Sequence, residues 1–486
     1  MKKQHVVSLV LASSLIASAA HAVDLIAIGT ISGTYEDFAT ETAFPLENGV
    51  PGNALGGIGS GLAYAGGTTF LALPDRGPNA NPYNPLVDDT VSYIARFQTL
   101  NLSLAQTADS VTGLPFTLTP MLSRTTLLSS SSPLDYGSGA GLGNQIDGVT
   151  PLGSGAPVLN GIDHTHYFTG RSDNFDPAKP STNARNARLD PESIRVSNDG
   201  NSVYVSDEYG PYIHEFDRSS GRRVRSFNLP SNLAITNLSS QKDVEIAGNT
   251  VGRVTNKGME GLAITPDGKM LVGIMQANLE QDKKKSLRIV TIDLKNGATH
   301  EYAYLLTDGS GVSEIVAVNN HQFLVDERDG TGLGDTPLLT DVASAATIKK
   351  LYLIDLAGAT DVTAIAGPNA DLSAYAVSKT LFLDVVAKLT GAGVNSYLIP
   401  SKIEGVAIGQ DVTVGGVTKH TLFIANDNDF LPAVADPFKL PSDATRGKIA
   451  NPNQFYVFAF ADSELPGFVP QKFKRSGDGR DSDCRN

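Results

Sequence analysis

The stretch that decides the fold is residues 190–211, Asp190-Pro-Glu-Ser-Ile-Arg-Val-Ser-Asn-Asp-Gly-Asn-Ser-Val-Tyr-Val-Ser-Asp-Glu-Tyr-Gly-Pro211. A short apolar strand after Glu192 is followed by an Asn-Asp-Gly turn and by a second strand, residues 202–206, that ends on Asp207 and Glu208. Two such runs joined by this turn predict a β-hairpin. Because the strands of a hairpin run in opposite directions, we expect Glu192 to lie beside Asp207 and Glu208.

The same pattern of acid, strand, turn, strand and acid recurs along the chain. The further copies begin near Glu260, Glu314 and Glu404 and end at Gln276, Asp326 and Asp427. A diverged first copy has Ser60 where the others have glutamate, and it ends at Asp75 and Arg76. Irregularly spaced repeats of short strands are typical of a β-propeller, whose first strand in every blade lines the central axis. We therefore predict an all-β propeller of five or six blades, with the repeated acids at one mouth of the axis.

The outer parts of the chain carry further signals. Two lysines, an apolar run and Ala20-His-Ala22 predict a signal peptide over residues 1–22, cleaved near Ala22, and hence a periplasmic or secreted protein. We expect one propeller domain over residues 23–470 and a polar, disordered tail over residues 471–486. Residues 129–188, rich in Gly, Ser, Pro and Asn, predict a long loop insertion over one face.

Two blade assignments complete the expected topology. The alternating run from Asp24 to Ser32 is predicted to complete the last blade and so to close the ring. In the fourth blade, we expect residues 350–356 and 362–365 to form the third and fourth strands, with residues 333–348 inserted before them. The mixed pattern of residues 374–389 fits either a short helix or a strand pair.

Composition limits the possible partners. The formal net charge of −13 disfavours nucleic-acid binding, because an acidic protein repels phosphate backbones. No apolar run after the signal peptide reaches the length of a membrane span. The single cysteine, Cys484, cannot form an internal disulfide, so the fold must depend on packing or on bound ions. We expect a monomer that acts on a small anionic or ester substrate.

The repeated carboxylates would repel one another at a shared mouth. Two unit charges a few ångström apart interact by roughly 4 kcal/mol at an effective dielectric constant of about 20. Either some carboxylates stay protonated or cations lie among them. Oxygen ligands favour Ca²⁺, and then Mg²⁺, over zinc. The candidate metal ligands are Asp75, Glu192, Asp207, Glu260, Glu314, Asp326, Glu404 and Asp427.

Arginines stand beside these acids in the sequence. Arg76, Arg195 and Arg328 could bind the anionic group of a substrate through charge-assisted hydrogen bonds. The candidate catalytic residues are Arg76, Glu192, Asp207 and Glu260. The alternative interpretation is structural: each glutamate caps its blade by accepting backbone N–H groups, and each arginine pairs with an acid of the next blade.

Four motifs together resemble a known family. They are Asp75-Arg-Gly-Pro78, Asp190-Pro-Glu192, Ser206-Asp-Glu-Tyr-Gly210 and Glu260-Gly-Leu-Ala263. The chain resembles, from about residue 57 to residue 460, the phytase-like family described as having esterase-like activity of phytase. The resemblance implies an exported β-propeller hydrolase, calcium-dependent, that acts on phosphoesters or other esters. Ser60, Gln276 and Asn278 depart from the acidic form of the repeat and reduce the charged ligands of the first and third blades.

Two other interpretations of the acids remain open. A lactonase-like propeller would need one metal held by an axial Glu, Asn and Asp, a set that Glu260 could form with Asn278 and either Asp207 or Asp427. A non-catalytic propeller would bind its ligand at the channel mouth and use the acids to hold structural calcium. No Gly-x-Ser-x-Gly motif supports a serine nucleophile of the common kind.

Overall fold

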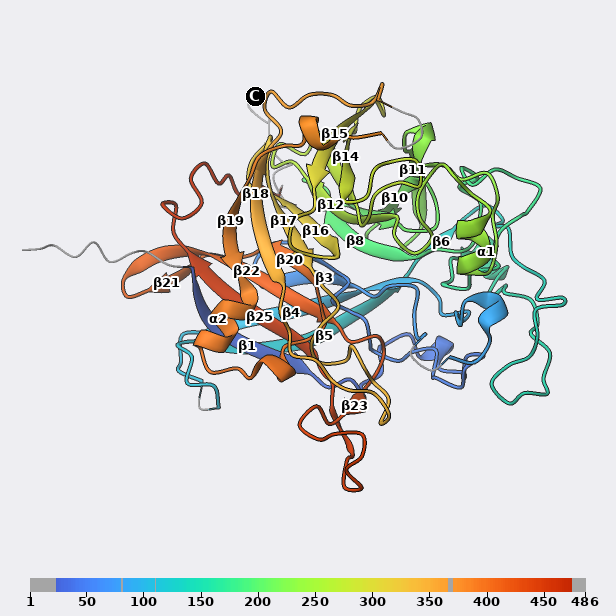
Figure 1. The fold of residues 1–486 in the computed structure, drawn as a ribbon, viewed down its shortest axis with the longest axis horizontal. Helices are drawn as coiled ribbons and strands as arrows, with labels where there is room; N and C mark the ends of the chain where they lie inside the picture. Colours follow the sequence, from blue (N-terminus) through green and yellow to red (C-terminus); the bar gives the residue numbers. More distant parts are fainter. Residues whose placement is uncertain (1–22, 80–81, 110, 366–369, 474–486) are drawn as a thin grey trace, which may run out of the picture.

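The computed structural model describes residues 23–473, except for residues 80–81, 110 and 366–369. The predicted signal peptide and residues 474–486 therefore lie outside the described residues. Over the described residues the chain forms a β-propeller with five blades, each an antiparallel sheet (Figure 1). The predicted all-β propeller is confirmed, and the blade number is five.

Each blade is built from successive strands that run from the axis outward. The first blade contains β2 (Gly61–Tyr64), β3 (Thr69–Leu73), β4 (Arg96–Ala105) and β5 (Thr117–Leu127). The second contains β8 (Pro191–Val196), β9 (Ser202–Asp207), β10 (Tyr212–Asp217) and β11 (Arg223–Asn228). The third contains β12 (Met259–Ile264), β13 (Met270–Met275), β14 (Ser286–Asp293) and β15 (Thr299–Leu305). The fourth contains β16 (Gly311–Ala317), β17 (Gln322–Arg328), β18 (Lys349–Asp355) and β19 (Lys379–Asp384).

The fifth blade closes the ring. It contains β20 (Lys402–Ile408), β22 (Val417–Asp427), β25 (Asn453–Phe460) and β1 (Asp24–Ile31), with β21 (Val412–Val414) added to β22. The outermost strand β1 comes from the start of the domain and pairs antiparallel with β25, from Asp24 opposite Ala459 to Ile31 opposite Asn453. The predicted closure by residues 24–32 is confirmed. It ties the two ends of the domain together in one sheet.

The remaining elements are short and lie in connections. The short strands are β6 (Ser129–Ser130), β7 (His166–Tyr167), β23 (Ala433–Ala435) and β24 (Lys448–Ala450). The described α-helices are α1 (Lys242–Ala247) and α2 (Val385–Gly391). The described 3-10 turns are Thr40–Thr42, Pro85–Val87, Ile162–His164, Ser231–Leu233, Ser373–Tyr375 and Ser396–Leu398. None of the described helices has the length and apolar character needed to cross a membrane.

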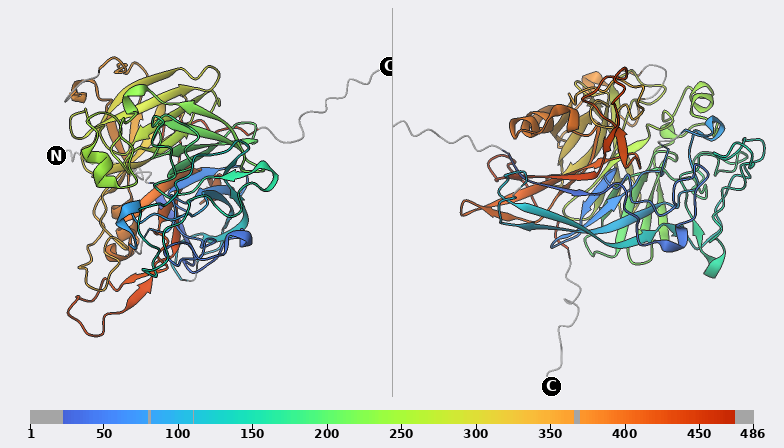
Figure 2. Two further views of the ribbon diagram at one scale, coloured as in Figure 1. Left: turned by 90° about the vertical axis from the view of Figure 1, so that its right-hand side faces the viewer. Right: turned by 90° about the horizontal axis from the view of Figure 1, so that it is seen from below.

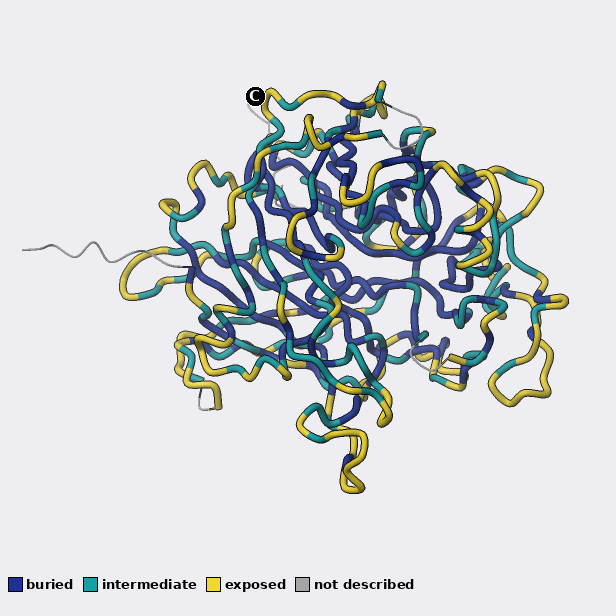
Figure 3. Tube along the Cα trace, viewed as in Figure 1, coloured by how far each residue is buried: buried dark blue, intermediate teal, exposed yellow. Residues whose placement is uncertain are grey.

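Small residues let the five inner strands approach one another around the axis. Strands β2, β8, β12, β16 and β20 contact each other in sequence and close the ring. A Cβ atom added at Gly261 would lie 2.7 Å from the backbone nitrogen of Ile315, and one added at Gly405 would lie 2.8 Å from the carbonyl oxygen of Gly59. This close approach explains why glycine follows glutamate in two of the repeats. The inner strands are buried, whereas the connections form the exposed outer surface (Figure 3).

The two faces of the propeller differ because the strands of each blade are antiparallel. Tight turns such as residues 197–201 and 265–269 join the first and second strands at one face, which we call the turn face. The connections between second and third strands, and those between blades, begin and end at the opposite face, which we call the loop face. The insertion of residues 129–188 belongs to the loop face and contains only short strands and a single 3-10 turn among its described elements. This insertion and the β23–β24 hairpin extend away from the blades (Figure 2).

One strand assignment from the sequence is wrong. The fourth strand of the fourth blade is β19, not residues 362–365, so residues 374–389 contain a strand followed by helix α2. Val362 instead donates its backbone N–H to the carbonyl oxygen of Glu301 (2.8 Å) and packs against Ala303 of the third blade. An apolar run alone does not say which blade it will join. The insertion between β17 and β18 is confirmed.

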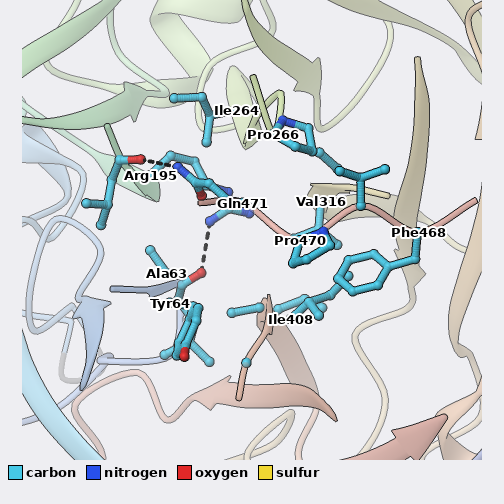
Figure 4. Close-up of a pocket in the computed structure, with 17 residues that line it drawn as sticks. Ala63, Tyr64, Arg195, Ile264, Pro266, Val316, Ile408, Phe468, Pro470 and Gln471 are labelled. Carbon is cyan, nitrogen blue, oxygen red and sulfur yellow. Dashed lines mark hydrogen bonds between the residues drawn. The ribbon is translucent and has the colours of Figure 1, made fainter. Parts of the chain in front are cut away.

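A C-terminal segment closes the turn-face mouth of the axis. These residues, 461–473, are called the C-terminal strap. Val469 donates its N–H to the carbonyl oxygen of Val318 (2.8 Å), and the Gln471 amide donates to the carbonyl oxygen of Val196 (2.8 Å). Between the strap and the inner strands lies a cavity of about 80 Å³ (Figure 4). Gln471, the first residue of the predicted tail, is thus anchored to the propeller.

Candidate functional site

β-Bulges direct acidic side chains to the loop-face mouth of the axis. In β8, β12 and β20, the pairing with the second strand is interrupted near the loop-face end. Glu192, Glu260 and Glu404 lie at these interruptions. A bulged residue is not paired across the strands and can turn its side chain away from the regular pleat. The three glutamates interact electrostatically with one another, which places them in a common group.

The fourth blade does not follow the repeat as the sequence suggested. Val312 pairs with Glu327 and Glu314 pairs with Asp326, so the bulged residue of β16 is Ser313. Glu314 therefore occupies the position of Gly261, not that of Glu260. The sequence pattern equated Glu314 with Glu260, which is wrong by one residue. The pairing register of the strands, not the position of the acid, decides which residue is bulged.

The second strands add a further set of side chains at the same mouth. Equivalent positions at this end of the second strands are held by Glu208, directly after β9, by Gln276, directly after β13, by Arg328 in β17 and by Asp427 in β22. Asp207, the predicted candidate, lies one residue earlier. Its carboxylate accepts hydrogen bonds from the backbone N–H groups of Asp190 (3.0 Å), Tyr209 (3.0 Å) and Gly210 (3.1 Å). Asp207 thus caps the turn that follows its strand.

Two carboxylate triads could each hold a cation. Asp75, Asp427 and Asp429 bring one oxygen each within 4.8 Å of the others, at the junction of the first and fifth blades. Asp190, Glu192 and Glu208 do the same at the start of the second blade, and all three are buried. Asp190, Glu208 and Asp429 were not among the candidates from the sequence.

Three neighbouring acids carry oxygen atoms without partners. Glu260 accepts a hydrogen bond from the Gln276 amide (2.8 Å) through Oε1 and is linked to the Glu208 carboxyl group by a side-chain hydrogen bond, but its buried Oε2 accepts from no amide, hydroxyl or cationic donor of the described residues. The same holds for Oε2 of Glu404 and for both carboxylate oxygens of Asp326. Glu260, Glu404 and Asp326 are only 2%, 3% and 1% exposed. Buried polar atoms are normally paired, so these oxygens are available to a ligand from outside the chain.

Burial and mutual repulsion raise the pKa values of this group. Burial, reinforced by the charge of Glu260, raises the pKa of Glu192 well above its ordinary value. Burial and then the charge of Asp190 raise the pKa of Glu208 to about 7. Burial and then the charge of Asp427 raise the pKa of Asp75. Without cations, burial and mutual repulsion therefore favour the protonated form of these carboxyl groups.

Cationic side chains compensate only part of this charge. Arg76 Nη1 lies 2.7 Å from Asp190 Oδ2, Arg328 pairs with Glu404, and Lys402 Nζ lies 2.7 Å from Asp427 Oδ2. We call these three cations and the surrounding carboxylates the acid mouth. Its described carboxylates are Asp75, Asp190, Glu192, Glu208, Glu260, Asp326, Glu404, Asp427 and Asp429. They outnumber the cations three to one.

Two other predicted site residues, Arg195 and Glu314, form an ion pair deeper in the axis. Arg195 Nη2 lies 2.8 Å from Glu314 Oε2, and Arg195 Nη1 donates to the carbonyl oxygen of Leu62 (2.9 Å). Arg195 lines the cavity beneath the C-terminal strap on the turn-face side (Figure 4). Asn278, the amide residue considered for a lactonase-like site, uses its side-chain amide to donate to the carbonyl oxygen of Leu279 (2.9 Å).

The sequence therefore located most of the acid mouth and missed part of it. The predicted residues brought together there are Asp75, Arg76, Glu192, Glu260, Asp326, Arg328, Glu404 and Asp427. The missed residues were marked only by their neighbours. Asp190 and Glu208 flank predicted candidates, Asp429 closes the Asn-Asp-Asn-Asp run, and Lys402 lies two residues before Glu404.

Comparison with known proteins matches residues 53–430 to the phytase-like family, described as esterase-like activity of phytase. An uncharacterized secreted protein of Arthroderma benhamiae is 28% identical over 329 residues, which cover 57% of this chain and 60% of that protein. The chain thus spans less than two thirds of that relative.

Two solved β-propeller structures are distant matches. The periplasmic gluconolactonase of Pseudomonas aeruginosa is 10% identical, with 90% of this chain and 99% of that chain covered and a TM-score of 0.31. A putative 6-phosphogluconolactonase from Bacteroides uniformis is 12% identical, with 82% and 88% covered and a TM-score of 0.28. Scores this low relate neither the sites nor the substrates of these proteins to those of this chain.

Proposed function

This chain belongs to the phytase-like family, and we propose that it is a metal-dependent hydrolase of phosphoesters or other esters that works at the acid mouth. The observation that carries the proposal is the pair of carboxylate triads at one end of the axis. Capping of the blades explains Asp207, whose oxygens accept backbone N–H groups. It does not explain the buried and unpartnered oxygens of Glu260, Glu404 and Asp326.

The donor set fits a hard cation. All six ligand atoms of the triads are carboxylate oxygens, from Asp75, Asp427 and Asp429 and from Asp190, Glu192 and Glu208. Such oxygens suit Ca²⁺ and, less well, Mg²⁺, whereas zinc prefers nitrogen and sulfur ligands. When bound, calcium would supply positive charge to an anionic substrate and lower the pKa of a bound water.

The side chains of the acid mouth would orient the substrate and move its protons. The Arg76 and Arg328 side chains, which are 11% and 14% exposed, can donate to the oxygens of a phosphoryl or carboxylate group. Glu260, whose pKa is raised by burial and by the neighbouring Glu208 carboxyl group, is the group that we propose for proton transfer. Glu192 is assigned to the cation. Asp207 and Arg195 are assigned structural roles because their polar atoms are engaged by the protein itself.

Purified protein tests the proposal directly. We expect cleavage of p-nitrophenyl phosphate or p-nitrophenyl acetate in calcium, loss of cleavage after treatment with EDTA, and recovery when calcium is added back. Calcium binding without cleavage of either ester would favour a non-catalytic binding propeller. One tightly bound calcium per chain, with cleavage of a lactone alone, would favour the lactonase-like interpretation.

Export and oligomeric state are part of the proposal. We propose that residues 1–22 are removed on export and that the mature chain is a monomer. N-terminal sequencing of the secreted or periplasmic protein should begin at Val23, and light scattering should give the mass of one chain. Retention of Met1, or a mass of two chains, would contradict these assignments.

A further inference from the structure

The Glu314 carboxylate lies on the axis and is fully engaged by the protein. It is 0% exposed and receives contacts from three different inner strands. The Ser193 hydroxyl of β8 donates to it (3.0 Å), as do the backbone N–H groups of Leu262 in β12 (3.1 Å) and Ile315 in β16 (2.9 Å). Arg195 Nη2 lies 2.8 Å from its Oε2. Glu314 therefore differs from Glu260, whose Oε2 accepts from no amide, hydroxyl or cationic donor of the described residues.

Arg195 extends this contact to a fourth strand. Its Nη1 donates to the carbonyl oxygen of Leu62 in β2 (2.9 Å), and its Nη2 donates to that of Ile315 (3.0 Å). One ion pair thus connects four of the five inner strands across the axis. The Arg195 side chain of this ion pair also lines the strap-covered cavity (Figure 4).

One partner of Glu314, Ser193, lies in the β8 bulge, and another, Leu262, pairs regularly with Gly273 just beyond the β12 bulge. Ser193 directly follows Glu192, and Leu262 lies two residues after Glu260. The Ser193 N–H is itself bound by the Ser206 hydroxyl (2.9 Å), which donates in turn to the carbonyl oxygen of Glu260 (3.3 Å). A bulge loses part of its ladder of hydrogen bonds, so contacts from outside the ladder must fix its conformation.

We propose that Glu314 is a positioning residue, which holds the bulges of Glu192 and Glu260 in the geometry that binds the cation, and that it is not itself a metal ligand. The inference rests on the proposed function. Groups that orient metal ligands typically change metal affinity by about 10- to 100-fold when they are replaced. A purely structural ion pair would instead change stability and leave the affinity of the folded protein unaltered.

Two matched double variants separate these roles. Arg195→Met with Glu314→Gln removes both charges but keeps an amide oxygen for the N–H groups of Leu262 and Ile315. Arg195→Met with Glu314→Leu removes the charges and the acceptor together. Calcium affinity is measured by titration calorimetry on each folded protein, with circular dichroism as the check of folding. We expect the Gln variant to stay within about threefold of the wild type and the Leu variant to bind at least about tenfold more weakly.

The other outcomes would overturn the inference. If both double variants bind calcium as tightly as the wild type, Glu314 acts only as a structural ion-pair partner. A loss of at least about tenfold in the Gln variant would instead make Glu314 a ligand. If the Leu variant does not fold, Ser193→Ala decides: calcium binding weakened by about threefold or more supports positioning, and unchanged binding contradicts it. No calcium binding by the wild type would overturn the proposed function as well, whereas the other contradictory results leave that function intact.

Discussion

The two mouths of one axis are built from the same five inner strands and have opposite character. The loop-face mouth gathers the carboxylates of the acid mouth, and several of their buried oxygens have no partner among the described residues. The turn-face mouth is lined by apolar side chains such as Val196, Ile264 and Val316 and is covered by the C-terminal strap. The two mouths therefore differ because of the residues at the strand ends, since the blades are common to both. The loop-face end carries reactive groups, and the turn-face end is packed and covered.

The difference has an energetic cause. Crowded carboxylates at low exposure destabilise one end of the fold unless cations compensate them. Tight turns and a packed strap add burial at the other end without adding charge. Changes at the loop-face mouth should thus alter activity and calcium binding, and changes at the turn-face mouth should alter stability alone.

The largest effect is expected at the acid mouth. Glu192→Gln removes one oxygen anion from a triad, and we expect activity to fall by at least about 100-fold, equivalent to roughly 3 kcal/mol of barrier. Because the pKa of Glu192 is already raised, this change should leave the melting temperature in EDTA unchanged or higher. Asp243→Asn, at an exposed acid of α1, is the matched control and should change neither quantity. A large drop in the melting temperature in EDTA would show that Glu192 is structural.

A core residue of the strap provides the opposite test. Leu465 is 0% exposed, so Leu465→Ala should lower the free energy of unfolding by about 2 to 4 kcal/mol through lost burial and a cavity. Denaturant unfolding measures this loss. Calcium affinity and kcat of the folded variant should remain within about twofold of the wild type, because Leu465 packs in an apolar cluster that contains none of the acid-mouth residues. A loss of calcium affinity in this variant would break the comparison.

A smaller effect is expected from pH at the turn face. The His420 ring lies 2.7 Å from Asp411 and 2.8 Å from Asp462. Burial lowers the pKa of His420, but the two aspartates outweigh burial and raise it above its ordinary value. This stabilisation is fully present below the unfolded pKa of about 6.5 and is lost as pH rises through the folded pKa.

The variant His420→Gln isolates that contribution. It should destabilise the protein more at about pH 5.5 than at about pH 9, by less than about 1 kcal/mol because both aspartates are largely exposed. Thermal melts of wild type and variant at the two pH values give the difference. Equal losses at both values would mean that the His420 charge contributes nothing.

The sequence was sufficient for the fold because each hairpin repeats its own signals. The turn of the second blade and the Glu-Gly-Leu-Ala run of the third were enough to predict a ring of inner strands with acids at one end. The closure by β1 followed from one alternating run near the start of the domain.

The details of the site depended on backbone register, which the sequence does not display. Whether Asp207 or Glu208 faces the mouth, and whether Ser313 or Glu314 is bulged, is decided by a shift of one residue in pairing. The strand of the fourth blade was missed for a related reason. Residues 362–365 and β19 both fit a strand pattern, and only packing against the third blade separates them.

Crystals grown with calcium test the central claim most directly, because anomalous difference density locates the ion without any assumption about the substrate. The account predicts strong peaks within coordination distance of Asp75, Asp427 and Asp429 and of Asp190, Glu192 and Glu208. Absence of any peak at the loop-face mouth in saturating calcium would contradict it.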